Sequence, residues 1–189
     1  MKIIIIGAGE VGYHIAQKLT GESIDVVIIE SDRDRIRQIE ETLDAKFIHG
    51  SGSSPDVLRQ AGISRAQMVI AVSDQDEVNI VACLVANHYS PGSVKVARVR
   101  NPAYINAPAV FEGLRFDLFI NPEYEASEKI VKLLDIPGAL DLIEFADGRL
   151  LMIGFRVMPE SRLAKRKLFT LGELVSGYNP LVTAIYRGK

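Results

Sequence analysis

A run of four isoleucines followed at once by three closely spaced glycines constrains the fold of this chain most strongly. Residues 3–6 are all isoleucine, and residues 7–12 read Gly-Ala-Gly-Glu-Val-Gly. A continuous apolar run of this length is typical of a parallel strand that is covered on both faces. The G-x-G-x-x-G spacing after it permits a tight turn into a helix. These residues therefore predict a strand, a glycine-rich turn and a helix, in that order.

The first 120 residues alternate short β-branched runs with helical patterns. We expect strands at residues 3–6, 26–29, 47–48, 68–72, 94–99 and 116–120. Helical patterns begin at about Glu10, after the capping residue Ser31, after Ser54–Pro55 and at Asp74. The pattern that begins at Asp74 continues to about Asn87. This alternation predicts an α/β fold of the Rossmann type, a doubly wound parallel sheet.

The pattern changes after Asn121–Pro122. A helix is expected as far as Leu134, and two apolar runs at 139–145 and 150–157 flank a turn and predict a β-hairpin. Residues 181–186 read as one further strand. We therefore predict a Rossmann domain at 1–121, a crossover helix and linker at 122–138, and a small, incomplete α+β domain at 139–189.

Composition excludes several classes of protein. The chain has 189 residues, 48% of them apolar, and a formal net charge of only −2 with acids and bases interspersed, so we expect no binding to nucleic acid. No apolar stretch approaches the length of a spanning helix, and the first residues lack a signal-peptide layout, so we expect no direct membrane insertion.

The single cysteine, Cys83, excludes an internal disulfide framework and is expected to be a buried thiol. It lies in the apolar stretch Ile80–Ala86, which fits either the core of the domain or a subunit interface.

Each glycine of the motif has a physical task in binding a dinucleotide. Gly7 permits the tight turn, Gly9 lets the backbone approach a pyrophosphate, and Gly12 allows close packing of helix on strand. The helix start then offers free N–H groups and the positive end of its dipole to the phosphates. Glu30 ends the second expected strand, 18 residues after Gly12, where an acid binds the ribose.

A carboxylate at Glu30 accepts hydrogen bonds from ribose hydroxyls and repels a 2′-phosphate, so NAD(H) is expected rather than NADP(H). Arg33 complicates this expectation, because a nearby arginine can bind a 2′-phosphate or stack on adenine. The alternative role of Glu30 is that of a helix-capping carboxylate.

Further candidate contacts lie at other strand ends, where open α/β sheets bind their ligands. Ser51 and Gly52 belong to a loop that either closes over the adenosine or simply leads into a helix. Asp74, after Ser73, either contacts the ligand or caps the next helix. Arg98 on the fifth strand needs a phosphate or an inter-strand ion pair, and both remain open.

An NAD-dependent oxidoreductase is the alternative to a pure binding function. Hydride transfer needs a substrate pocket with a positioned acid or base. The residues after Gly138 supply no suitable histidine or lysine–carboxylate pair, and none of the three histidines has a catalytic partner or metal-ligand spacing. We therefore expect that the chain is not an enzyme.

Taken together, the motifs resemble the TrkA family of RCK (regulator of potassium conductance) proteins. The matching stretches are 1–12, Glu30, 49–52, 71–74, 97–100 and 134–138, and the segment from Phe145 is similar to the small TrkA-C domain. The resemblance covers essentially the whole chain. The family usually carries two such units in tandem, whereas this sequence contains one glycine fingerprint.

The resemblance implies a cytoplasmic, nucleotide-sensing regulatory subunit, or a fragment of one, of a Trk-type potassium uptake channel. Such a subunit lies against the inner face of the plasma membrane through its channel partner, forms a homo-oligomer of at least two copies, and binds NAD(H) or, as a second option, ATP or ADP. Carried over by position, its binding residues are Gly7, Ala8, Gly9, Glu10, Val11, Glu30, Ser51, Gly52, Ser73, Asp74 and Arg98.

Overall fold

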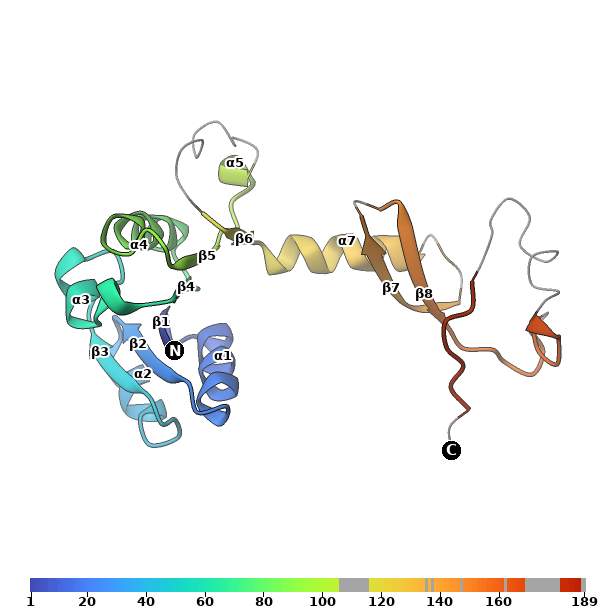
Figure 1. Ribbon diagram of the computed structural model, residues 1–189, viewed down its shortest axis with the longest axis horizontal. Helices are drawn as coiled ribbons and strands as arrows, with labels where there is room; N and C mark the ends of the chain where they lie inside the picture. The colour runs from blue at the N-terminus through green and yellow to red at the C-terminus, as the bar shows by residue number, and fades with distance from the viewer. Residues whose placement is uncertain are drawn as a thin grey trace. The chain divides into compact units, whose positions relative to one another are not determined.

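The computed structural model describes residues 1–105, 116–134, 136, 138–146, 148–161, 163–168 and 181–187. The chain divides into two compact units, residues 1–126 and residues 127–189. Figure 1 shows the elements of both units in chain order, and each unit is described by itself.

The first unit is built on a six-stranded sheet whose paired strands are all parallel. Its strands are β1 (Lys2–Ile6), β2 (Asp25–Glu30), β3 (Lys46–His49), β4 (Met68–Ala71), β5 (Val94–Arg98) and β6 (Leu118–Ile120). They lie in the order β3-β2-β1-β4-β5-β6. This order reverses between β1 and β4, and sheets of this type bind ligands outside the carboxyl ends of the strands at that point. The predicted Rossmann-type fold is confirmed.

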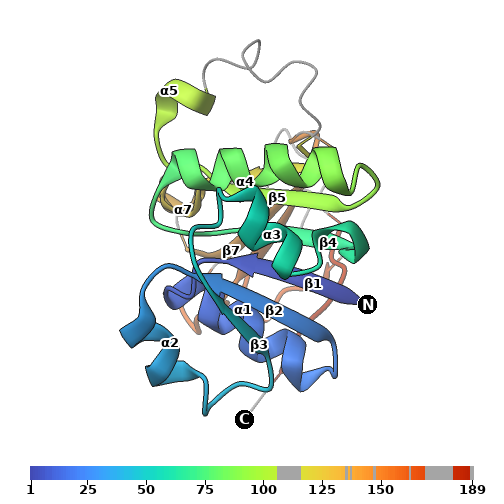
Figure 2. The same ribbon diagram turned by 90° about the vertical axis from the view of Figure 1, so that its left-hand side faces the viewer.

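Helices connect the strands and cover both faces of the sheet. They are α1 (Glu10–Gly21), α2 (Arg33–Ile39), α3 (Pro55–Gln60), the 3-10 turn η1 (Ile63–Arg65), α4 (Asp76–Tyr89) and the short α5 (Pro102–Ile105). Figure 2 shows α1 and α2 on one side of the sheet and α4 on the other. The sheet is therefore the middle layer of three.

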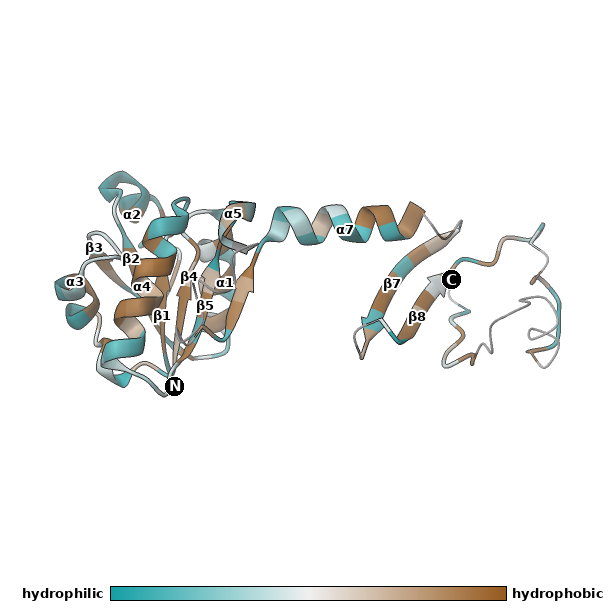
Figure 3. Cartoon of the chain, turned by 90° about the horizontal axis from the view of Figure 1, so that it is seen from above, coloured by the Kyte–Doolittle hydropathy of each residue, from teal (hydrophilic) through white to brown (hydrophobic). Residues whose placement is uncertain are grey.

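The isoleucine run of β1 supplies both cores of this unit at once. Successive side chains of a strand point to opposite faces. Ile4 and Ile6 accordingly pack in the cluster formed with α3 and α4, while Ile3 and Ile5 pack in the cluster formed with α1. All four side chains are at most 1% exposed, and Figure 3 shows the central strands as the apolar layer. Burial on both faces explains why the run does not alternate with polar residues.

The apolar stretch of α4 belongs largely to the core of its own domain. Ile80, Cys83 and Ala86 are buried, while Val81 is 38% exposed. Of the two explanations for this stretch, core packing is thus confirmed for most of it. The Cys83 thiol lies 3.7 Å from the Val96 carbonyl oxygen, and burial raises its pKa to about 12.

In the described part of the second unit, a hairpin follows the later residues of a helix. Helix α7 (Pro122–Leu134) begins in the first unit, and β7 (Ala139–Phe145) pairs antiparallel with β8 (Leu150–Phe155). Within the second unit, Lys129 pairs with Asp141 and Lys132 with Glu144, each at 2.8 Å. The predicted β-hairpin is confirmed.

Residues 181–186, which the sequence predicts as a strand, form none. The described residues 181–187 have no regular secondary structure, and Leu181 and Tyr186 are 85% and 98% exposed. A strand needs a partner for its backbone N–H and C=O groups. Within the described residues, the small sheet contains β7 and β8 alone. The prediction failed because β-propensity does not provide that partner.

Within the described part of the chain, no helix combines the length and the apolar character that crossing a bilayer requires.

We expect the Cys83 thiol to be unreactive toward a disulfide reagent in the native protein at slightly alkaline pH. The thiolate is the reactive form, and the raised pKa leaves almost none of it. Because the chain has one cysteine, the absorbance of the product released from the reagent measures this thiol alone. One equivalent should appear in denaturant. Release of a full equivalent from the native protein within the mixing time would contradict the buried position.

Candidate functional site

The glycine-rich turn lies between the carboxyl ends of β1 and β4, where the strand order reverses. Gly7 has a φ of +93°, in the left-handed region that favours glycine. A Cβ on Gly7 would lie 2.7 Å from the Cα of Ser73, and a Cβ on Gly12 would lie 1.9 Å from the Gly7 carbonyl oxygen. Packing alone therefore requires both glycines. They let β1, β4 and α1 meet at van der Waals distance.

The first turn of α1 presents backbone N–H groups that the helix itself does not use. Gly9 is the N-cap residue, and no side chain caps the helix. The first helical hydrogen bond runs from the N–H of Tyr13 to the Gly9 carbonyl oxygen at 2.8 Å. The N–H groups of Glu10, Val11 and Gly12 precede this bond and have no acceptor within the helix. Together with the helix dipole, they form a site suited to an anion such as a diphosphate.

The Glu30 carboxylate at the end of β2 holds the glycine-rich turn in place. Its side chain is buried, and its Oε2 accepts the N–H of Ala8 at 2.6 Å. Its Oε1 accepts the N–H groups of Ser31 at 2.7 Å and Asp32 at 2.9 Å. The Ser31 hydroxyl donates to the same Oε1 at 3.2 Å. Glu30 thus joins the turn after β1 to the turn after β2.

Asp32, and not Glu30 or Ser31, caps helix α2. The Asp32 Oδ1 accepts the N–H groups of Asp34 at 2.8 Å and Arg35 at 3.3 Å. Glu30 accepts only from residues before the helix, so its alternative role as a helix cap is wrong. The capping role expected for Ser31 is also wrong, because its hydroxyl is bonded to Glu30. The sequence did not identify Asp32 as the cap, because Ser31 and Asp32 are adjacent and both are residues that commonly cap helices.

Arg33 lies toward the end of β3. Its Nε donates to the Nδ1 of His49 at 3.4 Å, while the His49 Nε2 lies 3.0 Å from the Ser31 carbonyl oxygen. The carbonyl can only accept, so Nε2 carries the proton and Nδ1 is the acceptor. The arginine beside the glycine-rich turn is instead Arg35, whose Nη1 lies 3.3 Å from the position of a Cβ on Gly9. Sequence reasoning did not single out Arg35.

The loop after β3 packs tightly against β1. A Cβ on Gly52 would lie 2.1 Å from the Cγ2 of Ile6, so this glycine has a packing role of its own. The Ser51 hydroxyl lies 2.8 Å from the Ser53 hydroxyl, and the Ser51 carbonyl oxygen accepts the N–H of Ser54 at 3.1 Å. The loop is thus closed on itself beside the end of β1, and its contact with a ligand remains a prediction.

A fully buried amide, Asn79 of α4, joins the ends of β4 and β5. Its Oδ1 accepts the N–H of Ser73 at 2.9 Å and the Ser73 hydroxyl at 2.7 Å. Its Nδ2 donates to the carbonyl oxygens of Ser73 at 3.0 Å and Arg98 at 2.9 Å. Sequence reasoning missed Asn79, although one amide in an otherwise apolar helical stretch is a usable signal, because buried polar groups are nearly always bonded.

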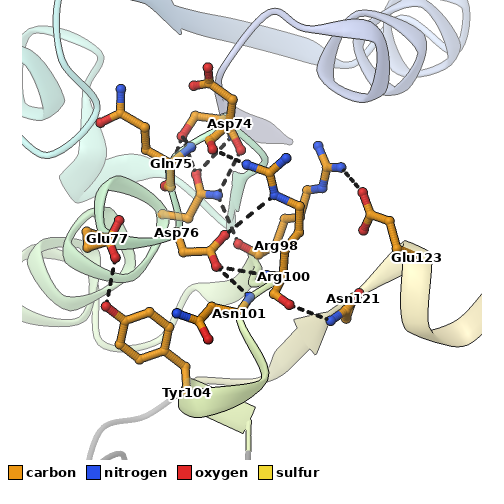
Figure 4. Close-up of polar contacts among 12 residues, drawn as sticks. Asp74, Gln75, Asp76, Glu77, Arg98, Arg100, Asn101, Tyr104, Asn121 and Glu123 are labelled. Atoms are coloured by element: carbon orange, nitrogen blue, oxygen red, sulfur yellow. Dashed lines mark hydrogen bonds and ion pairs between the residues drawn. The ribbon is translucent and has the colours of Figure 1, made fainter.

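Asp76 ties α4 to the segment after β5 (Figure 4). Its Oδ2 accepts the N–H groups of Arg100 at 3.0 Å and Asn101 at 2.8 Å, and the Arg100 guanidinium donates to the Asp74 carbonyl oxygen. Helix α4 begins at Asp76 after Gln75 as its N-cap residue, so the capping role expected for Asp74 is wrong. The Asp74 carboxylate is exposed and points away from this cluster, and its contact with a ligand remains a prediction.

Arg98 is paired with an acid of the protein. Its Nη2 lies 2.5 Å from the Glu123 Oε1 in the first turn of α7, and its side chain is 17% exposed. An ion pair is therefore present, but the inter-strand pair that the sequence suggested is wrong, because Glu123 stands on helix α7. The pKa of Glu123 is lowered by its own backbone N–H and by the Arg98 guanidinium. A phosphate at Arg98 would have to compete with Glu123.

The assembled residues form a candidate binding site at the edge of the sheet. The glycine-rich turn and the first N–H groups of α1 suit a diphosphate, and the Glu30 carboxylate beside them suits a hydroxylated sugar. Within the described residues, no three histidine, cysteine or carboxylate groups are arranged to hold a metal ion.

Comparison with known proteins gives one family. The TrkA-N domain model matches residues 3–122. The Trk system potassium uptake protein TrkA of Halomonas elongata is 39% identical over 189 residues, which are 99% of this chain and 41% of that protein. The TrkA homolog of Archaeoglobus fulgidus is 37% identical over 188 residues, 99% of this chain and 42% of that protein. The chain thus spans about two fifths of the length of these relatives.

Solved structures share the fold. The TrkA-N domain of the Escherichia coli inner membrane protein ybaL superposes with a TM-score of 0.62 at 20% identity, covering 70% of this chain and 96% of that one. The GsuK channel bound to NAD superposes with a TM-score of 0.54 at 19% identity, covering 63% and 21%. The curated relatives are named as potassium uptake proteins, and neither name describes an enzyme.

We expect Gly12→Ala to lower the free energy of unfolding by about 1–3 kcal/mol, the usual effect of overpacking. The added Cβ would lie 1.9 Å from a backbone oxygen, so the turn or the helix must shift. Gly21→Ala is the matched control in the same helix, because its Cβ would meet nothing within 4 Å. The control should be neutral or stabilising. Equal urea midpoints for both variants would contradict the close approach.

The pair formed by Arg98 and Glu123 should make stability depend on pH. A lowered folded-state pKa means that the contribution of Glu123 is present above the ordinary carboxyl pKa and is lost as the pH falls through the lowered value. Wild type should therefore lose more stability on acidification than Glu123→Gln. At neutral pH, a double-mutant cycle with Arg98→Gln should give a coupling of up to about 1 kcal/mol. Identical pH profiles of the two proteins would contradict this.

Proposed function

The chain belongs to the TrkA-N family, and we propose that it is the NAD(H)-binding part of a regulatory protein in a Trk-type potassium uptake system. In this proposal, residues 1–121 bind the nucleotide, residues 122–138 form the crossover helix and linker, and residues 139–189 belong to a TrkA-C domain. The protein acts in the cytoplasm, against the inner face of the plasma membrane, as an oligomer attached to its channel partner. The names of its curated relatives support the potassium uptake system.

The observation that carries the proposal is the geometry of the turn between β1 and α1. Unused N–H groups at residues 10–12 face the same edge of the sheet as the Glu30 carboxylate, which lies 2.6 Å from the Ala8 nitrogen. A diphosphate bound at the start of α1 brings its ribose toward this carboxylate. The two features together suit an adenosine diphosphate group, whether it is free or part of a dinucleotide.

Glu30 has one acceptor position left for a ribose. Each of the two carboxylate oxygens offers about two lone-pair positions, and several donors can share one oxygen. Its Oε1 accepts three bonds from Ser31 and Asp32, whereas its Oε2 accepts one, from Ala8. A ribose hydroxyl can therefore donate to Oε2 without breaking the bonds that hold the turn. A 2′-phosphate would place its negative charge beside this carboxylate, which favours NAD(H) over NADP(H). The NAD-bound GsuK channel, which shares the fold, supports the same choice.

A chain of contacts runs from the nucleotide site to the crossover helix. Gly7 abuts Ser73, Asn79 bonds both Ser73 and the Arg98 carbonyl oxygen, and the Arg98 guanidinium pairs with Glu123 in the first turn of α7. A ligand that moves the turn after β1 disturbs the contacts of Ser73, Asn79 and Arg98 one after another. Regulation then requires that the nucleotide has different affinities for two arrangements of the subunits.

We expect the purified chain to bind NADH more tightly than NADPH in a calorimetric titration, and to bind ADP and ATP. Glu30→Gln should weaken NADH binding and reduce the preference over NADPH, because the buried negative charge is removed. Glu40→Gln, an exposed acid that follows α2, is the matched control and should change neither.

The same titration followed by light scattering and repeated with a solubilised Trk membrane subunit tests the regulatory role. The chain should have at least the mass of a dimer, and nucleotide should change its assembly or its affinity for the membrane subunit. Absence of binding to all four nucleotides would refute the nucleotide site. Equal affinity of every nucleotide for every assembled form would refute the sensing role.

A further inference from the structure

Helix α2 begins with three arginines at alternate positions, and each has a different neighbour. Arg33 donates to His49. Arg37 pairs with Asp34 of its own helix at 3.1 Å. Arg35 lies beside the glycine-rich turn, with its Nη1 3.3 Å from the position of a Cβ on Gly9.

Arg35 has no ion pair with any carboxylate among the described residues. Its guanidinium nevertheless stands next to Gly9, the N-cap residue of α1. The start of a helix carries a partial positive charge, so a cation placed there without a counter-ion is electrostatically unfavourable. An anion bound at the turn would remove this repulsion and attract both groups.

The backbone of Arg35 is fixed although its side chain is exposed. Its N–H donates to the capping carboxylate of Asp32 at 3.3 Å, and Ile36, the next residue, is buried. The first turn of α2 is therefore held at the edge of the sheet. A long side chain that starts from this turn reaches the glycine-rich turn without any movement of the backbone.

We propose that Arg35 is a specificity-determining residue that binds the diphosphate of the nucleotide together with the first N–H groups of α1. This inference rests on the proposed nucleotide site and deepens it. The guanidinium is always charged and presents a planar fork that matches phosphate oxygens. The ligand class is a nucleoside diphosphate or a dinucleotide, and the unphosphorylated nucleoside is discriminated against.

The proposal gives the two arginines on this edge different tasks. Arg33 is held near the end of β3 by His49, on the sugar side of Glu30, whereas Arg35 is next to the phosphate-binding turn. Because Arg35 belongs to α2 and the turn precedes α1, a bound diphosphate would also connect these two helices. The number of phosphate groups on the bound nucleotide would thus affect how firmly α2 is held against the glycine-rich turn.

The experiment compares ADP with adenosine on wild type, Arg35→Gln, Arg35→Lys and Arg37→Gln. Arg35→Gln should weaken ADP and NADH binding by about tenfold to a hundredfold, the usual effect of losing a charge-assisted bond. Its binding of adenosine, followed by chemical-shift changes that detect weak ligands, should not change. Arg35→Lys should recover part of the loss, because it keeps the charge without the planar fork.

Arg37→Gln is the matched control, an exposed arginine of the same helix that pairs with Asp34, and should leave the ratio of ADP to adenosine affinity as it is in wild type. An unchanged ratio in Arg35→Gln overturns the proposal, and so does an equal fall in both arginine variants. A wild-type protein that binds neither ADP nor NADH overturns the proposed nucleotide site instead. Unfolding midpoints of all variants show whether any of them is destabilised.

Discussion

The fold and the site both depend on one close approach, that of the turn after β1 to the start of α1 and the end of β4. The Cα of Gly12 is so near the Gly7 carbonyl oxygen that a Cβ would lie 1.9 Å from it, and Gly7 itself abuts Ser73. Two glycines thus let a strand, a helix and a neighbouring strand converge at one point. The same convergence leaves the first N–H groups of α1 unused at the edge of the sheet.

Buried polar side chains form hydrogen bonds with the backbone at the edge where the strands end. Glu30 accepts backbone N–H groups from the turns after β1 and β2, Asn79 bonds the ends of β4 and β5, and Asp76 accepts the N–H groups that follow β5. Buried backbone groups need partners, and these three side chains supply them. The protein's own bonds therefore organise this edge, which is the arrangement that limits the ordering cost of binding.

The charges at this edge are separated in a way that suits an adenosine diphosphate group. The negative charge of Glu30 lies beside the position that we propose for the ribose, while the cation of Arg35 and the start of α1 lie beside the position that we propose for the phosphates. Arg98 points elsewhere, toward Glu123 on α7. Arg98, which the strand pattern singled out, thus pairs with a residue of helix α7. Arg35, which the pattern did not single out, lies beside the glycine-rich turn.

Local patterns were enough to predict the Rossmann fold, the glycine-rich turn, the position of Glu30 and the burial of Cys83, because strand burial, glycine geometry and local spacing act over a few residues. The packed molecule was needed to show which acid caps α2, which arginine lies beside Gly9, and that Asn79 bonds two strand ends. It also showed that residues 181–186 have no strand partner among the residues that the structure describes. These outcomes depend on groups distant in the chain, and their distances are set only when the sheet and helices have packed.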